Sequence, residues 1–128
     1  MLITVFLFSN VISAQQEISE NVIRAYEEEN WVYFGNNTFL HREKESGSGN
    51  PKVLSLNIDS NSSTAMLYLY EYDCSNQRMM MIAYKTYKNK AIMEKDHYLF
   101  ESKREWQYPL KTSFGDSMMS AVCEKYGN

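Results

Sequence analysis

The stretch T-A-M-L-Y-L-Y-E-Y-D-C, Thr64–Cys74, decides the fold of this chain. Its side chains alternate between two sides of an extended backbone, and both sides are largely apolar. One side carries Met66, Tyr68, Tyr70 and Tyr72, and the other carries Leu67, Leu69, Glu71 and Asp73. Alternation with a period of two is typical of a β-strand, and a strand that is apolar on both faces belongs inside a sheet. We therefore expect Thr64–Cys74 to be a central strand.

The residues after this strand predict a hairpin. Ser75–Gln77 is a short polar turn, and Arg78–Lys88 then returns to an extended pattern. Two such strands joined by a short turn pair in antiparallel fashion. Other extended segments are expected at Trp31–Phe34, Thr38–His41, Lys52–Asp59 and Lys103–Leu110, with the S-G-S-G-N-P stretch Ser46–Pro51 as an exposed loop.

Two helices are expected near the ends of the chain. Glu17–Asn30 places apolar residues at helical spacing, and Ser113 with Asp116 forms an S-x-x-D cap for a second helix. This second helix repeats an apolar residue every fourth position, at Phe114, Met118, Val122 and Tyr126. Gly127 then stands where a cap glycine belongs. The pattern as a whole predicts an α+β fold, mainly an antiparallel sheet with a C-terminal helix packed on it.

The N-terminus predicts export. Residues 1–14 contain the apolar run Leu2–Phe8 followed by small and polar residues, as in a signal peptide whose cleavage follows Ala14. Residues 15–30 are then an N-terminal helical or linker segment, and 31–128 the single domain. A net charge of −3 argues against nucleic acid as the partner, and the apolar run is too short for a transmembrane segment. We expect an exported protein, in the periplasm, at the cell surface or outside the cell.

The chain has two cysteines, Cys74 and Cys123. In an exported chain, two cysteines most simply form one disulfide. A catalytic thiol would need a positioned base, and no motif links either histidine, His41 or His97, to a cysteine. A bridge would tie the end of the central strand to the C-terminal helix.

A spaced set of residues resembles the bacterial surface-adhesin protein E family of small exported domains. The set comprises Trp31, Tyr72–Cys74, Tyr84, Tyr87, Trp106, Pro109, Ser113 and Val122–Cys123. The resemblance implies an antiparallel sheet with a packed helix and a Cys74–Cys123 bridge. It also implies a domain without enzymatic activity, which in some members binds host extracellular-matrix proteins or cells.

The function predicted on this basis is protein binding, with adhesion as the specific role and a host matrix or envelope protein as the partner. An alternative is a periplasmic inhibitor or regulator of an enzyme such as a lysozyme. A free sheet edge would also allow a homodimer. An enzyme would require a concave pocket with convergent polar groups, and the sequence has no phosphate-binding loop, zinc-ligand spacing or hydrolase elbow.

The most basic stretch is the candidate ligand-binding site. Lys85, Lys88 and Lys90, with Tyr84 and Tyr87 between them, would offer positive charge to acidic glycans or matrix proteins. The competing interpretation is a solvated strand end, where lysines protect a sheet edge from unwanted pairing.

Neither a metal nor a cofactor is predicted. Met79–Met81 could suggest a copper site, but consecutive strand residues face opposite ways and cannot converge on one ion. These methionines, with Met118 and Met119, are better explained as core residues. The row Tyr68, Tyr70 and Tyr72 forms either one face of the core or an exposed contact surface, and the core is favoured.

Overall fold

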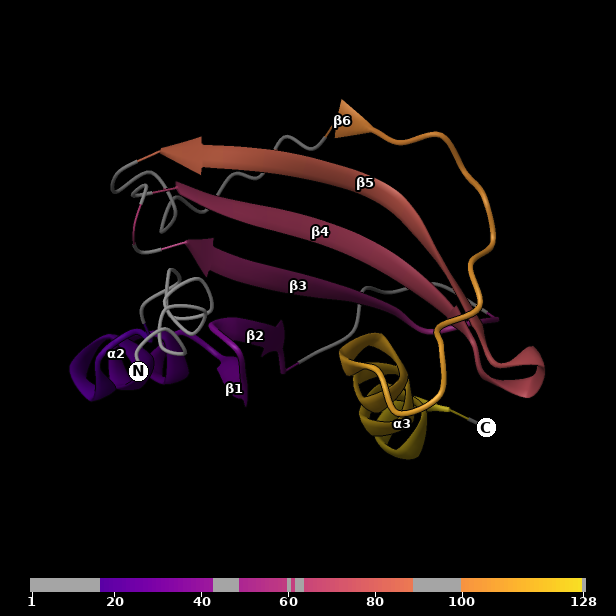
Figure 1. Ribbon diagram of the computed structural model, residues 1–128, viewed down its shortest axis with the longest axis horizontal. Helices are drawn as coiled ribbons and strands as arrows, with labels where there is room; N and C mark the ends of the chain where they lie inside the picture. Colours follow the sequence, from indigo (N-terminus) through magenta and orange to yellow (C-terminus); the bar gives the residue numbers. More distant parts are fainter. Residues whose placement is uncertain (1–16, 43–48, 60, 62–63, 89–99, 128) are drawn as a thin grey trace, which may run out of the picture.

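The computed structural model describes residues 17–42, 49–59, 61, 64–88 and 100–127. Six strands form one antiparallel sheet whose spatial order follows the chain (Figure 1). The strands are β1 (Trp31–Gly35), β2 (Thr38–His41), β3 (Lys52–Asp59), β4 (Thr64–Asp73), β5 (Arg78–Lys88) and β6 (Phe100–Glu101). The predicted α+β architecture is confirmed. The expected signal peptide, residues 1–14, lies outside the described residues.

Strand β4 lies inside the sheet, between β3 and β5, as its two apolar faces predict. It pairs with β3 from Asp59↔Thr64 to Lys52↔Glu71, so the full length of β3 lies against β4. The hairpin to β5 is also confirmed, and its turn is the short 3-10 helix η1 (Cys74–Asn76). Gln77 closes that turn in the left-handed region, with φ of 55°.

Helix α2 (Glu20–Glu28) begins where Ser19 accepts a hydrogen bond from the backbone N–H of Val22, which satisfies one free donor of the first turn. Its one buried residue, Tyr26, packs against Phe39 of β2 with ring centroids 4.8 Å apart. That contact belongs to an apolar cluster with Trp31, Leu56, Ile58, Ala65, Leu67 and Tyr87. The helix is shorter than the expected Glu17–Asn30.

Helix α3 (Phe114–Tyr126) begins at the predicted cap. The Ser113 hydroxyl accepts from the Asp116 N–H at 3.1 Å, and the Asp116 carboxylate accepts from the Thr112 N–H at 3.0 Å. Gly127 follows the helix, but its φ of −73° is not the left-handed conformation of a typical glycine cap. Buried in α3 are Met118, Met119 and Val122, which pack with Leu40, Val53, Tyr72 and Met79.

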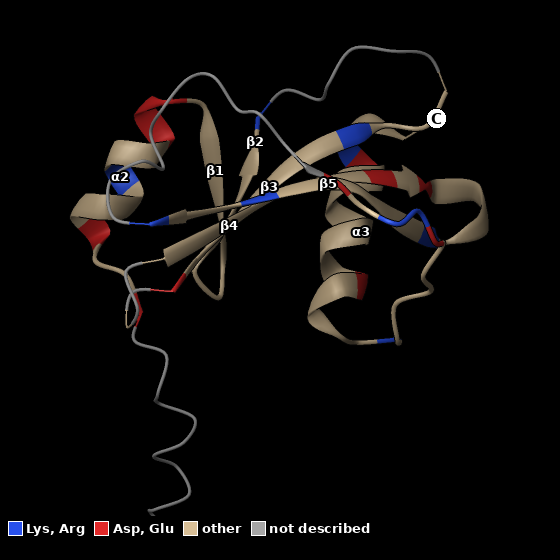
Figure 2. Cartoon of the chain, turned by 90° about the horizontal axis from the view of Figure 1, so that it is seen from above, with Lys and Arg blue, Asp and Glu red and all other residues tan. Residues whose placement is uncertain are grey.

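The two helices contact opposite faces of the sheet. On β3, Leu56 and Ile58 belong to the cluster of α2, whereas Val53 belongs to the cluster of α3. Successive strand residues point to opposite faces, so two residues of one strand whose sequence numbers differ by an odd number lie on opposite sides of the sheet. Figure 2 shows α2 on one side of β1 and β2 and α3 on the other.

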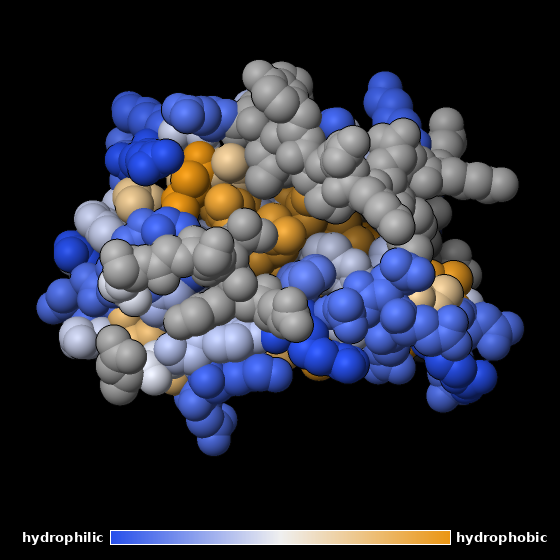
Figure 3. All heavy atoms as spheres, turned by 180° about the vertical axis from the view of Figure 1, so that it is seen from behind, coloured by the Kyte–Doolittle hydropathy of each residue, from blue (hydrophilic) through white to orange (hydrophobic). Residues whose placement is uncertain are grey.

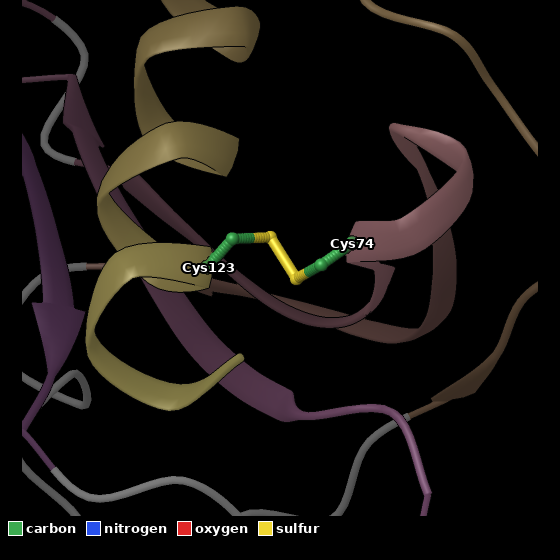
Figure 4. Close-up of a disulfide and its surroundings, with 2 residues drawn as sticks. All are labelled: Cys74 and Cys123. Carbon is green, nitrogen blue, oxygen red and sulfur yellow. A yellow bond between two sulfur atoms is a disulfide. The ribbon is translucent and has the colours of Figure 1, made fainter. Parts of the chain in front are cut away.

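The predicted disulfide is present. Cys74, at the end of β4, is bonded to Cys123 in α3, with the two Cα atoms 5.8 Å apart (Figure 4). The bond fixes the last turns of α3 to the hairpin end of the sheet. Of the methionines predicted to be core residues, Met79, Met118 and Met119 are buried beside it, whereas Met80 and Met81 are only half-buried.

The strand expected at Lys103–Leu110 does not form. Only Gln107 makes a bridge, to Met79, through backbone bonds of 2.8 and 2.9 Å. Trp106 does not mark a strand there, because its ring packs against Arg78, with the guanidinium 4.2 Å from the ring centre. Pro109 has no N–H for a ladder, and the sheet instead adds the two residues of β6 beside Ala83 and Tyr84.

The helices do not cover the sheet from end to end. From behind, apolar side chains are seen across the middle of the molecule between hydrophilic margins (Figure 3). Leu54 and Leu69, on the same face as the α2 cluster, are only half-buried. No helix among the described residues is long and apolar enough to cross a membrane.

Candidate binding groove beside helix α3

The structure divides the predicted lysine and tyrosine site between two faces of β5. Tyr84 and Lys88 pair with Tyr68 and Thr64, on the face that α3 contacts. Lys85 lies on the other face, with its ammonium 5.1 Å from the centre of the Tyr87 ring. These side chains therefore do not form one continuous surface.

Tyr87 is not available to a ligand as the sequence suggests, because it is only 2% exposed in the α2 cluster. Its cross-strand partner Ala65 is buried beside it. Lys90 lies outside the described residues. Of the five predicted residues, Tyr84, Lys85 and Lys88 remain as surface candidates.

A groove lies on the face of the sheet that α3 contacts, next to the area that the helix covers. Its volume is about 230 Å³, and its floor and walls come from four strands and one helix. The lining residues are Thr38, Ser55, Asn57, Tyr68, Tyr70, Met79, Phe114, Gly115 and Met118. The groove exists because α3, held at one end by the disulfide, covers only the part of this face around Val53 and Tyr72.

The tyrosine row of β4 runs from the core into this groove. Tyr72 is fully buried, and its ring centroid lies 6.0 Å from that of Tyr70. Tyr70 and Tyr68 are half-buried, with centroids 5.5 Å apart. Tyr84 of β5 lies directly across from Tyr68. The row is therefore core at one end and accessible at the other, so each sequence interpretation holds for part of it.

Polar groups on β2 and β3 form the facing wall. The Asn57 side-chain amide donates to the Thr38 hydroxyl at 2.8 Å, and that hydroxyl donates to the Asn36 carbonyl at 3.0 Å. These bonds hold the amide and the hydroxyl in place before any ligand arrives. This wall was not predicted from the sequence, since the contact between Thr38 and Asn57 depends on the register in which β2 pairs with β3.

The groove offers neutral hydrogen-bonding groups. Burial raises the pKa of the Tyr68 phenol, and burial together with the nearby Tyr68 raises that of Tyr70, so both remain protonated near neutral pH. Those of its lining residues that the structure describes include no carboxylate, amine, imidazole or thiol. Across the described part of the chain, no group of three or more His, Cys, Asp or Glu residues could hold a metal ion. The arrangement is suited to stacking and hydrogen bonding.

A second polar cluster stabilises the turn after β4. The Asp73 carboxylate accepts from the Asn76 amide and from Arg78 Nε, both at 2.8 Å. These two hydrogen bonds lower the pKa of Asp73, with the Asn76 bond as the larger cause. Arg78 in turn contacts Trp106, so the cluster holds the segment after β6 against the hairpin.

Comparison with known proteins found no match: no family model, no curated protein and no solved structure is similar to this chain. The resemblance to the surface-adhesin protein E family therefore stays a prediction.

Proposed function

We propose that this chain is an exported, non-enzymatic domain that binds another protein through the groove beside α3, and that its specific role is adhesion to host matrix proteins or cells. The observation that carries the proposal is the accessible end of the tyrosine row, Tyr68 and Tyr70, set against the polar wall of Thr38 and Asn57.

Tyrosine suits such a surface for physical reasons. Its ring supplies a large apolar area with few rotatable bonds, and its hydroxyl supplies one polar contact. Tyrosine is accordingly enriched where proteins bind each other and among the residues that contribute most to binding. Because Tyr68 and Tyr70 already contact each other, little side-chain freedom remains to be lost on binding.

The size of the groove favours a protein ligand over an enclosed small molecule. Pockets for drug-sized ligands have about 300–1,000 Å³, whereas this groove has about 230 Å³. It can accept one or two side chains from a larger partner that also rests on its rim. Export is supported by the disulfide, since such bonds persist in oxidising compartments.

The proposal can be tested by binding of the disulfide-intact protein to an extracellular-matrix extract and to a cell-envelope extract, measured by surface plasmon resonance. Replacing both Tyr68 and Tyr70 by alanine should weaken binding about tenfold or more, as for central tyrosines at interfaces. Tyr108→Ala is the matched control, because Tyr108 is 64% exposed and lies outside the groove.

Two further experiments decide whether the groove or the lysine-bearing strand is the site, and whether the role is adhesion or periplasmic regulation. If Lys85→Ser with Lys88→Ser abolishes binding and the tyrosine variants do not, the lysine-bearing strand is the site and the groove proposal is wrong. If the protein is released with the periplasm and is protected from a surface label, the adhesive role is refuted in favour of a periplasmic regulator. Thermal melting of each variant separates lost contacts from lost folding.

A further inference from the structure

A second hollow lies beside the second half of α3, whereas the tyrosine groove lies beside its first half. Its walls come from the β1–β2 hairpin, β3 and the second half of α3 and are mainly apolar, with His41 as a polar member, and its volume is about 130 Å³. The wall residues are Val32, Phe34, Leu40, Val53, Ala121 and Val122. Phe34, in this pocket, contacts Phe114, in the groove, with ring centroids 5.5 Å apart, so this aromatic pair separates the two sites.

The size of the pocket limits what can enter. An apolar cavity of about 150 Å³ in another protein holds one benzene molecule, and this pocket is slightly smaller. It therefore fits one leucine-sized or phenyl-sized group, and the chain of a membrane lipid would not be enclosed. Val32 on the wall is 39% exposed, so the pocket opens to solvent.

The mouth of the pocket carries positive charge. Arg42, just after β2, and Lys125, in the last turn of α3, both line it and are both exposed. The Lys125 ammonium lies 5.6 Å from the centre of the Tyr126 ring, which also lines the pocket. Within the described part of the chain, none of the lining residues carries a carboxylate. An apolar hollow with two cations at its mouth is complementary to an apolar group that carries a carboxylate.

The pocket is held in shape by contacts on both sides. The Tyr126 hydroxyl donates a hydrogen bond to the Arg42 carbonyl, which joins the end of α3 to the end of β2. The Arg42 N–H donates to the Asn30 carbonyl at 2.7 Å. The disulfide at Cys123 anchors the same turns of the helix. Binding therefore requires little rearrangement of the backbone.

We propose that this pocket binds the C-terminal residue of a partner polypeptide, with an apolar side chain in the hollow and the terminal carboxylate at Arg42 and Lys125. A C-terminal leucine or phenylalanine carries both groups on a single residue, which is why it fits a hollow of this size better than a longer amphiphile. The site is independent of the tyrosine groove and of the function proposed for it.

The test uses N-acetyl-L-phenylalanine as the probe and its C-terminal amide as the matched control, with binding followed by amide chemical shifts of the disulfide-intact protein. The acid should produce saturable shifts at Val32, Ala121 and Val122. Two exposed ion pairs of about 0.5 kcal/mol each correspond to roughly fivefold in affinity. The amide should bind more weakly by that factor.

Three variants measure how much the two cations and the apolar hollow each contribute to binding of the probes. Arg42→Gln with Lys125→Gln, both on the surface, should weaken the acid about fivefold and leave the amide unchanged. Ala121→Leu should fill the hollow and abolish binding of both probes, whereas Tyr68→Ala, in the groove, should change neither. Equal affinity for acid and amide, or the absence of saturable shifts, would overturn the proposal. Tighter binding of octanoate than of the acid would overturn it in favour of a lipid-type ligand.

Discussion

Removal of the disulfide is the most quantitative test of how this fold is held together. We consider the double variant Cys74→Ala with Cys123→Ala. The bridge joins residues separated by 49 positions, and closing a loop of this length removes about 14 cal/mol/K of chain entropy from the unfolded state. At 25 °C that corresponds to about 4 kcal/mol, a large part of the roughly 5–15 kcal/mol by which a domain is stable.

The assay is urea unfolding followed by tryptophan fluorescence, since Trp31 is only 8% exposed in the folded protein. With a slope of about 2 kcal/mol/M, the midpoint should fall by about 2 M. Ser120→Ala is the control, because Ser120 is exposed on the same helix and its replacement should leave the midpoint nearly unchanged.

A loss below about 1.5 kcal/mol would refute the reasoning, because the bridge would then remove far less entropy than its loop length requires. The loss of cysteine packing cannot explain so small a value, since it also lowers the free energy of unfolding and would add to the entropic loss. Circular dichroism should still show the sheet, since the strand ladder from β1 to β5 does not pass through α3.

Three further predictions concern single side chains. Leu67→Ala, at a position 1% exposed in β4, should lower the free energy of unfolding by about 3 kcal/mol in urea titrations. Ser113→Ala removes the acceptor for the Asp116 N–H and should lower it by about 1 kcal/mol, seen as a reduced melting temperature. Hydrogen bonds from Asn76 and Arg78 lower the folded-state pKa of Asp73. Its stabilisation is therefore complete above the unfolded pKa of about 4 and is lost as pH falls through the folded value. Urea midpoints should fall more steeply on acidification for the native chain than for Asp73→Asn, and equal slopes would contradict this.

The strands could be predicted because their signals are local. The alternation in Thr64–Cys74 and the polar turn Ser75–Gln77 specify a two-faced strand and a hairpin without any distant residue. The cap at Ser113 is equally local. The error at Lys103–Leu110 arose where alternation had another cause, the contact of Trp106 with Arg78.

The candidate sites combine residues that are distant in the sequence, so most of each site could not be predicted from it. The groove joins Thr38 and Asn57 to Tyr68 and Tyr70, and the second pocket joins Arg42 to Lys125. No spacing in the chain signals these neighbours. The predicted lysine site failed for a local reason, because side chains alternate along β5 and Lys85 therefore faces away from Tyr84 and Lys88.

By itself, the sequence determined strands β1 to β5, the capped helix and the one pairing that two cysteines allow, because backbone periodicity, cap chemistry and cysteine number are local or countable. Only the tertiary structure decided which end of the tyrosine row is accessible. Tyr72 is buried because the disulfide holds α3 over that end of β4, and Tyr68 and Tyr70 line a groove because the helix does not reach further. Where a helix docks depends on contacts between distant segments, which no single stretch of sequence contains.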